Sequence, residues 1–284
     1  MNDLIASFRG EWLKLSRRPA TWILGLILVA LLLVLAYGFA ALAISVLSNQ
    51  PAGRPRAAVS AAQIHTLKAN VGPAHFLLTT LGAFSGIGYG SAIVVILGVL
   101  TYGSEYGWST LKTVFTQRPG RLATFGGKLL SLAVVLVIYA LAMLAVAAAA
   151  SAVLGTVYGS GGSWPGVTEI VKAFGACLLL MALWSGLGVL LAVLFKQAPL
   201  AIGLGIVYSI AIEGIIINIL SLDTSLKDIQ RGFPGANGTA LVNSFGSNAA
   251  NALVGPSQAT LVVAGYVIVF VLVAAVLLRA RDVT

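Results

Sequence analysis

Charged side chains are scarce in this 284-residue sequence: Asp, Glu, Lys and Arg make up 9% of it, apolar residues 59%, and the mean hydropathy is +1.00. A soluble domain carries roughly 25% charged residues. The scarcity excludes an ordinary soluble protein and predicts an integral membrane protein. The net charge of +9 is dispersed over loops and faces anionic lipid in this interpretation. Since no basic arm or patch is present, nothing supports nucleic acid as a partner.

Cysteine and histidine are almost absent as well. Cys177 is the single thiol, so no disulfide framework exists. His65 and His75 have no Cys, Asp or Glu nearby, whereas a metal site needs more ligands at closer spacing. We therefore predict no metal site. Ser85 and Ser185 lie within apolar runs that contain no histidine to act as a base, which argues against a membrane protease.

A phosphate-binding loop is missing too. Its pattern, G-x-x-x-x-G-K-[ST], lets backbone amides cradle a phosphate. The dipeptide Gly127-Lys128 fails it, because Leu122 stands where the first glycine is needed and Leu129 follows the lysine. We expect no enzymatic activity and no cofactor on this chain, so that any ATP and Mg²⁺ bind to a separate protein. No internal repeat of the kind found in many secondary carriers is visible.

What the sequence does contain is six apolar runs of about 20 residues, the length that crosses hydrocarbon. They are residues 22–47, 77–100, 129–154, 174–194, 200–220 and 259–278. The first run is too long for the apolar core of a cleavable signal peptide, so we count it as a span. The runs predict an all-α integral membrane fold with six transmembrane helices, and residues 1–284 form a single transmembrane domain.

Lysine and arginine are divided unevenly between the two sides of such a fold. One side collects eleven of the 17 basic residues, namely Arg9, Lys14, Arg17, Arg18, Lys112, Arg118, Arg121, Lys128, Lys196, Arg279 and Arg281. The other side has six, namely Arg54, Arg56, Lys68, Lys172, Lys227 and Arg231. Because basic loops stay on the cytosolic side, we predict that both termini and residues 102–128 are cytosolic.

The first 18 residues predict an amphipathic helix that lies in the membrane interface. Its apolar residues fall within one arc of a helical wheel, and its cations lie outside that arc. The apolar set is Leu4, Ile5, Phe8, Trp12 and Leu15, and the basic set is Arg9, Lys14, Arg17 and Arg18. Pro19 then ends the helix. The alternative is that residues 1–18 are only a positively charged segment that flanks the first span.

Two features of the second half stay open. Glu213 is the one acid deep inside a predicted span, where a carboxylate costs about 2.5–3.5 kcal/mol to insert. It is either a substrate- or proton-sensitive group in a central cavity, or a structural acid that is neutral or bonded to Asn218, Tyr208 or a neighbouring helix. Residues 221–258 form the longest predicted outer loop. Since structureless loops of this length are uncommon, we expect it to be partly helical, re-entrant or surface-lying.

Between the second and third runs lies the polar segment 102–128, YGSEYGWSTLKTVFTQRPGRLATFGGK. At helical spacing, Trp108, Leu111 and Phe115 share one face, and Glu105, Ser109 and Lys112 share another. Pro119 and Gly120 then end the helix, which leaves Arg118 and Arg121 exposed at the turn. The segment has the features of an ordered docking surface for a cytosolic partner. A solvated, positively charged loop is the alternative.

This segment and the N-terminus together resemble the permease subunits of bacterial six-span ABC exporters of the second exporter type. The resemblance rests on E-W-x-K-x-x-R-R-P from Glu11 to Pro19, on E-Y-G-W-S-T-L-K from Glu105, and on R-P-G-R-x-x-x-x-x-G-K from Arg118. In that family the corresponding segment is the coupling helix that docks on a separate ATPase. The resemblance implies this role for Glu105, Trp108, Ser109, Thr110, Lys112, Arg118, Pro119, Arg121 and Lys128. Ser109 stands where many members have glycine.

The resemblance further implies a multi-pass protein of the bacterial plasma membrane that pairs with a second permease copy or a paralogue. Two cytosolic ATP-binding subunits would power the outward movement of a lipophilic drug, peptide or lipid-like substrate by alternating access. Two alternatives remain at this point. One is an ATP-independent channel or secondary carrier, and the other is a structural or sensory membrane protein without a transport role.

Overall fold

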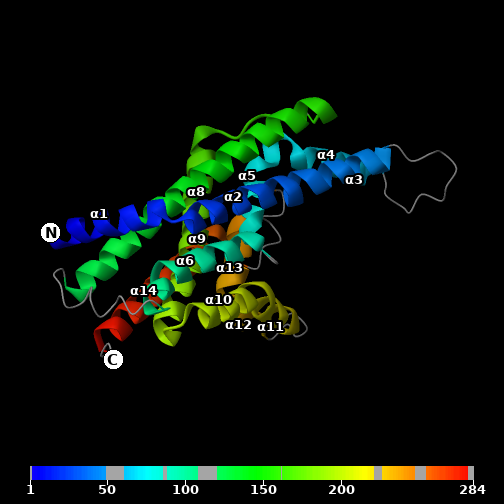
Figure 1. The fold of residues 1–284 in the computed structure, drawn as a ribbon. Coiled ribbons are helices and arrows are strands. Elements are labelled where there is room, and N and C mark those ends of the chain that lie inside the picture. Colours follow the sequence, from blue (N-terminus) through cyan, green and yellow to red (C-terminus); the bar gives the residue numbers. More distant parts are fainter. Residues whose placement is uncertain are drawn as a thin grey trace.

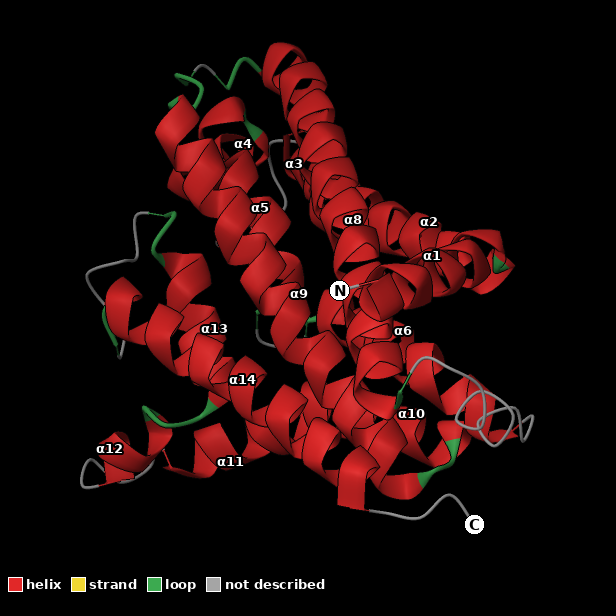
Figure 2. Cartoon of the chain, turned by 90° about the vertical axis from the view of Figure 1, so that its left-hand side faces the viewer, coloured by secondary structure: helices red, strands yellow, loops and turns green. Residues whose placement is uncertain are grey.

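The computed structural model describes residues 2–48, 61–85, 88–107, 120–160, 162–220, 226–246 and 254–280. Within these ranges the chain is helical, with short turns and no strand (Figures 1 and 2), which confirms the predicted all-α class. The α-helices are α1 (Asn2–Arg17), α2 (Pro19–Leu31), α3 (Phe39–Ser48), α4 (Ala61–Val71), α5 (Phe76–Leu81), α6 (Tyr89–Gly107), α8 (Arg121–Tyr158), α9 (Val167–Phe195), α10 (Ala198–Val207), α11 (Glu213–Leu220), α12 (Lys227–Gln230), α13 (Pro234–Asn243) and α14 (Pro256–Ala280). Short π-helical segments, Leu32–Gly38 and Tyr208–Ile212, join α2 to α3 and α10 to α11.

Five helices are long and apolar enough to cross a membrane, at Pro19–Ser48, Leu122–Tyr158, Val167–Phe195, Ala198–Ile217 and Pro256–Ala280. These five correspond to predicted runs. The remaining run, 77–100, is not one straight helix. It consists of two helical pieces, Pro73–Phe84 and Tyr89–Gly103, which meet at an angle of 52° and make a sixth span only if they count together.

The break in the second span lies in a glycine-rich stretch. Glycine has a low helix propensity, about 1 kcal/mol worse than alanine, and it also allows two backbone segments to lie unusually close together. A Cβ at Gly88 would lie 2.7 Å from the carbonyl oxygen of Ala83, and one at Gly90 would lie 2.8 Å from the same oxygen. The glycines therefore let the second piece fold closely against the end of the first.

Both described termini lie at the same end of the helical bundle. Figure 1 shows the start of α1 and the end of α14 there, beside the last turn of α6 and the first turn of α8. Helix α4 and the start of α9 lie at the opposite end. We refer to these as the α1 end and the α4 end. That the α1 end faces the cytosol stays a prediction from the distribution of lysine and arginine.

The centre of the bundle is the contact between α6 and α9; α10 packs against both of these helices, and α14 packs against α9. A Cβ at Gly98 of α6 would overlap the carbonyl oxygen of Ser185, and one at Gly188 of α9 would overlap that of Val95. Small residues of this kind let membrane helices approach backbone to backbone, where van der Waals contact holds them together.

Alanine scanning of α9 glycines is expected to separate packing from helix propensity. Gly188→Ala forces a Cβ into the backbone of α6, and overpacking of this kind typically costs about 1–3 kcal/mol. Gly175 is the matched control on the same helix, since a Cβ there meets nothing within 4 Å. Gly175→Ala is expected to keep or raise the melting temperature of the purified protein, and Gly188→Ala to lower it. Equal melting temperatures for the two variants would contradict the close contact.

Residues 221–258, predicted as an outer loop, contain helices α12 and α13. Helix α13 begins with Pro234 at its first position, where the missing amide hydrogen costs nothing. It packs against α14 and also contacts α9, and most of its residues are buried, including Asn237 and Leu241. The segment is therefore part of the bundle over its described residues.

Candidate functional site

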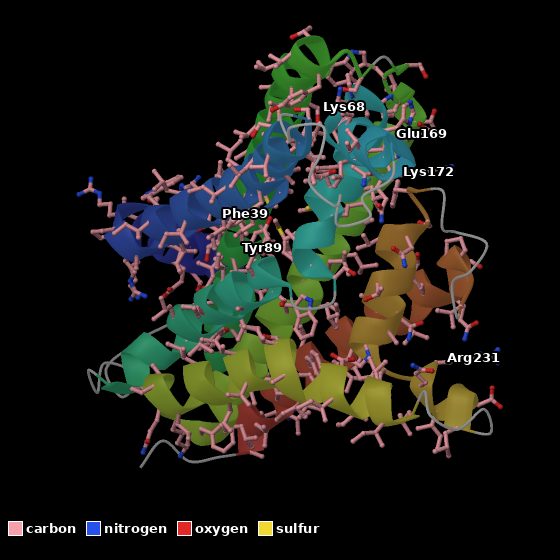
Figure 3. All side chains as sticks on the ribbon, turned by 90° about the vertical axis from the view of Figure 1, so that its right-hand side faces the viewer. Phe39, Lys68, Tyr89, Glu169, Lys172 and Arg231 are labelled. Carbon is pink, nitrogen blue, oxygen red and sulfur yellow. The ribbon has the colours of Figure 1, made fainter. Side chains whose placement is uncertain are left out.

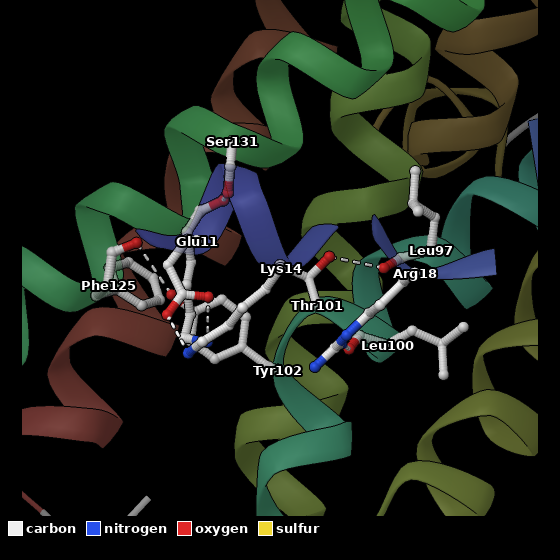
Figure 4. Close-up of polar contacts among 10 residues, drawn as sticks. Glu11, Lys14, Arg18, Leu97, Leu100, Thr101, Tyr102, Phe125 and Ser131 are labelled. Carbon is white, nitrogen blue, oxygen red and sulfur yellow. Dashed lines mark hydrogen bonds and ion pairs between the residues drawn. The ribbon is translucent and has the colours of Figure 1, made fainter. Parts of the chain in front are cut away.

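Three elements converge at the α1 end: α1, the last turns of α6 and the first turns of α8 (Figure 4). Helix α1 packs along the start of α8, and two glycines of α8 make this contact close. A Cβ at Gly126 would lie 2.8 Å from Cδ1 of Leu4, and one at Gly127 would overlap the hydroxyl of Ser7. The N-terminal helix is thus held against α8 by backbone-level packing.

A buried ion pair links α1 to α8 inside this contact. The Nζ atom of Lys128 lies 3.0 Å from Oε2 of Glu11, and the two side chains are only 2% and 11% exposed. The other carboxylate oxygen, Oε1, accepts a hydrogen bond of 2.9 Å from Lys14, which is half exposed on the solvent side. The ammonium of Lys128 also lies 5.4 Å from the centre of the Tyr102 ring, on α6.

The electrostatics of Glu11 follow from these contacts. Burial by itself raises the pKa of the Glu11 carboxyl, but the charges and hydrogen bonds of Lys128 and Lys14 outweigh burial and hold the pKa below its ordinary value. Glu11 is therefore ionised at neutral pH and faces the ammonium of Lys128 as a carboxylate. A pair of this kind is expensive to break, because removing one partner leaves the other charge buried.

Two hydrogen bonds to backbone carbonyls complete the cluster. The hydroxyl of Tyr102 donates to the carbonyl oxygen of Phe125 over 3.0 Å, and thus ties α6 to α8. The guanidinium of Arg18 donates to the carbonyl oxygen of Leu100 over 3.2 Å, and thus ties the start of the first span to α6. The Glu11–Lys128 cluster, which we define as Glu11, Arg18, Tyr102, Phe125 and Lys128, joins all three elements. It lies near the end of α6 and the start of α8, the two helices between which residues 108–119 stand in the sequence.

The predicted coupling residues are placed unequally. Glu105 belongs to the last turn of α6 and Arg121 is the first residue of α8. Lys128 is not at the surface, because its side chain is buried in the cluster. The remaining predicted coupling residues, Trp108, Ser109, Thr110, Lys112, Arg118 and Pro119, lie outside the described residues.

The N-terminal helix forms at Asn2–Arg17. Leu15 is buried and Trp12 packs against the protein core, while Ile5 is 46% exposed. Phe8 is half buried, Arg17 is exposed and Arg18 reaches α6 as described. One side of α1 thus contacts α8, which the amphipathic pattern alone did not indicate. Glu11 lies on that side, and sequence reasoning had not assigned it a partner.

Glu213, the acid inside the fifth predicted span, is buried at 3% exposure. Its carboxyl oxygen Oε1 accepts a hydrogen bond from the backbone N–H of Gly235, in the first turn of α13. The first N–H groups of a helix have no partner within it, so Glu213 caps α13. It also lines a cavity of about 50 Å³ together with Trp184 and Thr239. That volume suits a water molecule and not a drug, peptide or lipid.

These contacts give Glu213 a structural role, and contact with a substrate stays a prediction. Glu213→Gln keeps an acceptor oxygen for Gly235 and is expected to leave the melting temperature and transport nearly unchanged. Glu213→Leu removes the acceptor and leaves a buried N–H unsatisfied, which costs about 1–3 kcal/mol and should lower the melting temperature. If Glu213→Gln instead impairs transport at normal stability, the acid acts on the substrate and capping is not its main role.

Comparison with known families points in one direction. A family model described as ABC-2 family transporter protein matches residues 7–212 of the chain. The match takes in α1 from Ser7 onward, the Glu11–Lys128 cluster and residues 102–128, and it ends one residue before Glu213. No curated protein matches the chain.

Proposed function

Because the chain belongs to the ABC-2 family of transporters, as an ABC transporter permease subunit, we propose that it is the membrane-spanning part of an ATP-driven exporter. In this proposal ATP is bound and hydrolysed by separate cytosolic subunits. The α1 end faces the cytosol, the protein resides in the bacterial plasma membrane, and a second permease copy or paralogue completes the transport path. Residues 102–128 are the docking surface for the ATPase.

The observation that carries the proposal is the Glu11–Lys128 cluster. It connects the two helices that flank residues 108–119 with each other and with α1, through one ion pair of 3.0 Å and two hydrogen bonds. A force applied to the segment therefore moves α1, α6 and α8 together. An exposed loop without a mechanical role would need no buried charge pair at its base, since such a pair gains little stability relative to apolar packing.

The helices that leave the cluster are suited to carry this motion. Helix α8 is continuous from Arg121 to Tyr158, and thus extends from the docking segment to the α4 end. Helix α6 is fixed to α9 by glycine contacts at Gly98 and Gly188. ATP binding and release in the partner would tilt these helices as a unit and alternate the access of a path between the two permease halves.

The surface of the spans supports an apolar substrate. A groove of about 560 Å³ between α2 and α8 is lined almost entirely by apolar side chains, including Leu26, Leu33 and Val146. A lipophilic drug, peptide or lipid-like substrate would reach such a groove from the membrane. The class of substrate remains part of the proposal.

Purification in mild detergent tests whether ATP is hydrolysed by a separate subunit and not by this chain. The chain alone is expected to show no ATP turnover, because its sequence has no phosphate-binding loop. Protein purified from its native host is expected to bring with it an ATPase that contains such a loop, and the complex should hydrolyse ATP. Robust ATP turnover by the isolated chain, or repeated purification without any ATPase, would refute the proposal.

A further inference from the structure

A second polar site lies at the α4 end, far from the Glu11–Lys128 cluster. It is a cavity of about 190 Å³ between α4, the short helical turn Pro73–His75 and the chain that follows the end of α8. Its polar lining consists of His65, Lys68, His75, Tyr158 and Ser160. Figure 3, which looks onto this end of the bundle, labels Lys68. None of the predicted coupling or cavity residues belongs to this pocket.

The lining is rich in hydrogen-bond donors and has no negative charge. No Asp or Glu occurs among the described residues that line the pocket, whereas Lys68 contributes an ammonium group. The Tyr158 hydroxyl donates to the carbonyl oxygen of Ala41 over 3.3 Å. Two further polar atoms of the pocket residues, Nδ1 of His75 and Oγ of Ser160, are buried without a hydrogen-bond partner. Buried polar atoms normally have partners, so a ligand is one way to satisfy them.

Glycine residues in the backbone around the pocket leave space for the cavity. Gly159 adopts a left-handed conformation with φ of 61°, which reverses the chain directly after α8. At two other positions, glycine leaves no side chain to fill the cavity. A Cβ at Gly72 would lie 3.0 Å from the hydroxyl oxygen of Ser160, and a Cβ at Gly162 would lie 3.0 Å from the Cβ atom of Ala74. Larger residues at these positions would crowd the site.

The chemistry of the donors decides between a cation and an anion. Among the described residues, no three His, Cys, Asp or Glu side chains are grouped closely enough to hold a metal ion. The ammonium of Lys68 would repel one in this pocket. An ammonium, two imidazoles and a hydroxyl match the oxygen atoms of a phosphate group, which lysine binds as a point charge.

An exposed tryptophan beside the pocket indicates that the pocket lies at the level of the lipid headgroups. Trp164 follows the pocket residue Gly162 closely in sequence, is 50% exposed, and packs edge-on against Phe76 with the ring centres 5.6 Å apart. Tryptophan is enriched at the boundary between hydrocarbon and water. We propose that the pocket formed by His65, Lys68, His75 and Ser160 binds a phosphate group, from an anionic lipid headgroup or from a soluble phosphate.

Binding measurements on the full chain test this and separate the two sources. In one arm, the protein is released from nanodiscs of phosphatidylcholine with added phosphatidylglycerol, and native mass spectrometry counts the retained phosphatidylglycerol. In the other, the melting temperature is measured with inorganic phosphate and with chloride at equal ionic strength. Lys68→Gln and Ser160→Ala are the test variants. Lys172→Gln, a lysine outside the pocket at the same end of the bundle (Figure 3), is the matched control.

Lys68→Gln is expected to weaken binding about tenfold, which corresponds to about 1.4 kcal/mol, and Lys172→Gln to leave it unchanged. Ser160→Ala should weaken binding without altering the charge, and it keeps the test valid if Lys68→Gln fails to fold. Retention of phosphatidylglycerol alone identifies a headgroup site, and a melting shift with phosphate identifies a site for the soluble anion. Absence of both responses in the wild-type protein, or an equal loss in Lys172→Gln, would overturn the proposal.

Discussion

Glu11→Gln is expected to lower the free energy of unfolding by about 3 kcal/mol and to uncouple ATP turnover from transport in the assembled complex. Glutamine keeps the volume of Glu11 but removes the carboxylate that faces Lys128, whose side chain is 2% exposed. The buried ammonium then lacks its counter-charge at the joint of α1, α6 and α8. Thermal unfolding of the purified variant measures the first effect, and ATP turnover compared with transport measures the second.

Lys128→Met gives the complementary result. It removes the buried cation and preserves most of the side-chain length, while Glu11 keeps its hydrogen bond of 2.9 Å to Lys14. We expect a smaller loss of stability than in Glu11→Gln. The double variant should resemble Lys128→Met, because no buried cation remains to be compensated. If the two single effects simply add in the double variant, the two side chains do not interact, and the joint described here is wrong.

The same pair predicts how stability depends on pH. The pKa of Glu11 is lowered in the folded protein relative to its ordinary value of 4.5. Its contribution is therefore fully present above about pH 4.5 and is lost as the pH falls through the lower, folded-state pKa. Glu11→Gln should remove this part of the decrease in melting temperature at acid pH. Near neutral pH, the melting temperature of the variant should not depend on the pH through this residue.

Reversing the charge at the predicted turn of the docking segment is expected to abolish transport without preventing insertion. Arg118→Glu combined with Arg121→Glu replaces two cations that would face an acidic surface of the ATPase. Repulsion of up to several kcal/mol is then expected at the interface, enough to separate a transient complex. Glu105→Ala, at the other side of the segment, should have the same consequence. Transport and the amount of membrane-inserted protein are measured together.

A paired arginine change elsewhere controls for the altered net charge. Arg54→Glu combined with Arg56→Glu makes the same change of charge in the loop that we predict on the opposite side of the membrane. It should leave transport intact, provided that the protein inserts in its normal orientation. Normal transport by a fully inserted Arg118/Arg121 variant would exclude these arginines from docking.

The sequence predicted best those elements that a local residue pattern defines, such as the membrane spans. Apolar runs of about 20 residues predicted the spans, and five are single helices. The run 77–100 was predicted as one helix, but the structure breaks it near Gly88 and bends it by 52°. A hydropathy scale treats glycine as nearly neutral. It contains no information on backbone geometry, and so it could not predict that Gly88 and Gly90 let the chain pack closely against Ala83.

Contacts between distant residues were beyond such patterns. Glu11 belonged to a motif that we noted, yet its partner Lys128 is 117 positions away and was predicted to act in coupling to the ATPase. Only the packing of α1 on α8 shows that the two charges meet. The histidines at 65 and 75 have no Cys, Asp or Glu nearby in the sequence. Their convergence with Lys68 and Ser160 required the turn after α8 that Gly159 provides.

Site-specific photo-crosslinking in living cells tests directly whether residues 102–128 dock on a separate ATPase. A photoreactive phenylalanine analogue is placed at Trp108, in the docking segment, and in a second strain at Trp164, at the α4 end. We expect that position 108 crosslinks to an ATPase that contains a phosphate-binding loop, that the Arg118/Arg121 reversal removes this product, and that position 164 gives none. Absence of the product at position 108 in a well-expressed protein, or an equal product at position 164, would contradict this docking.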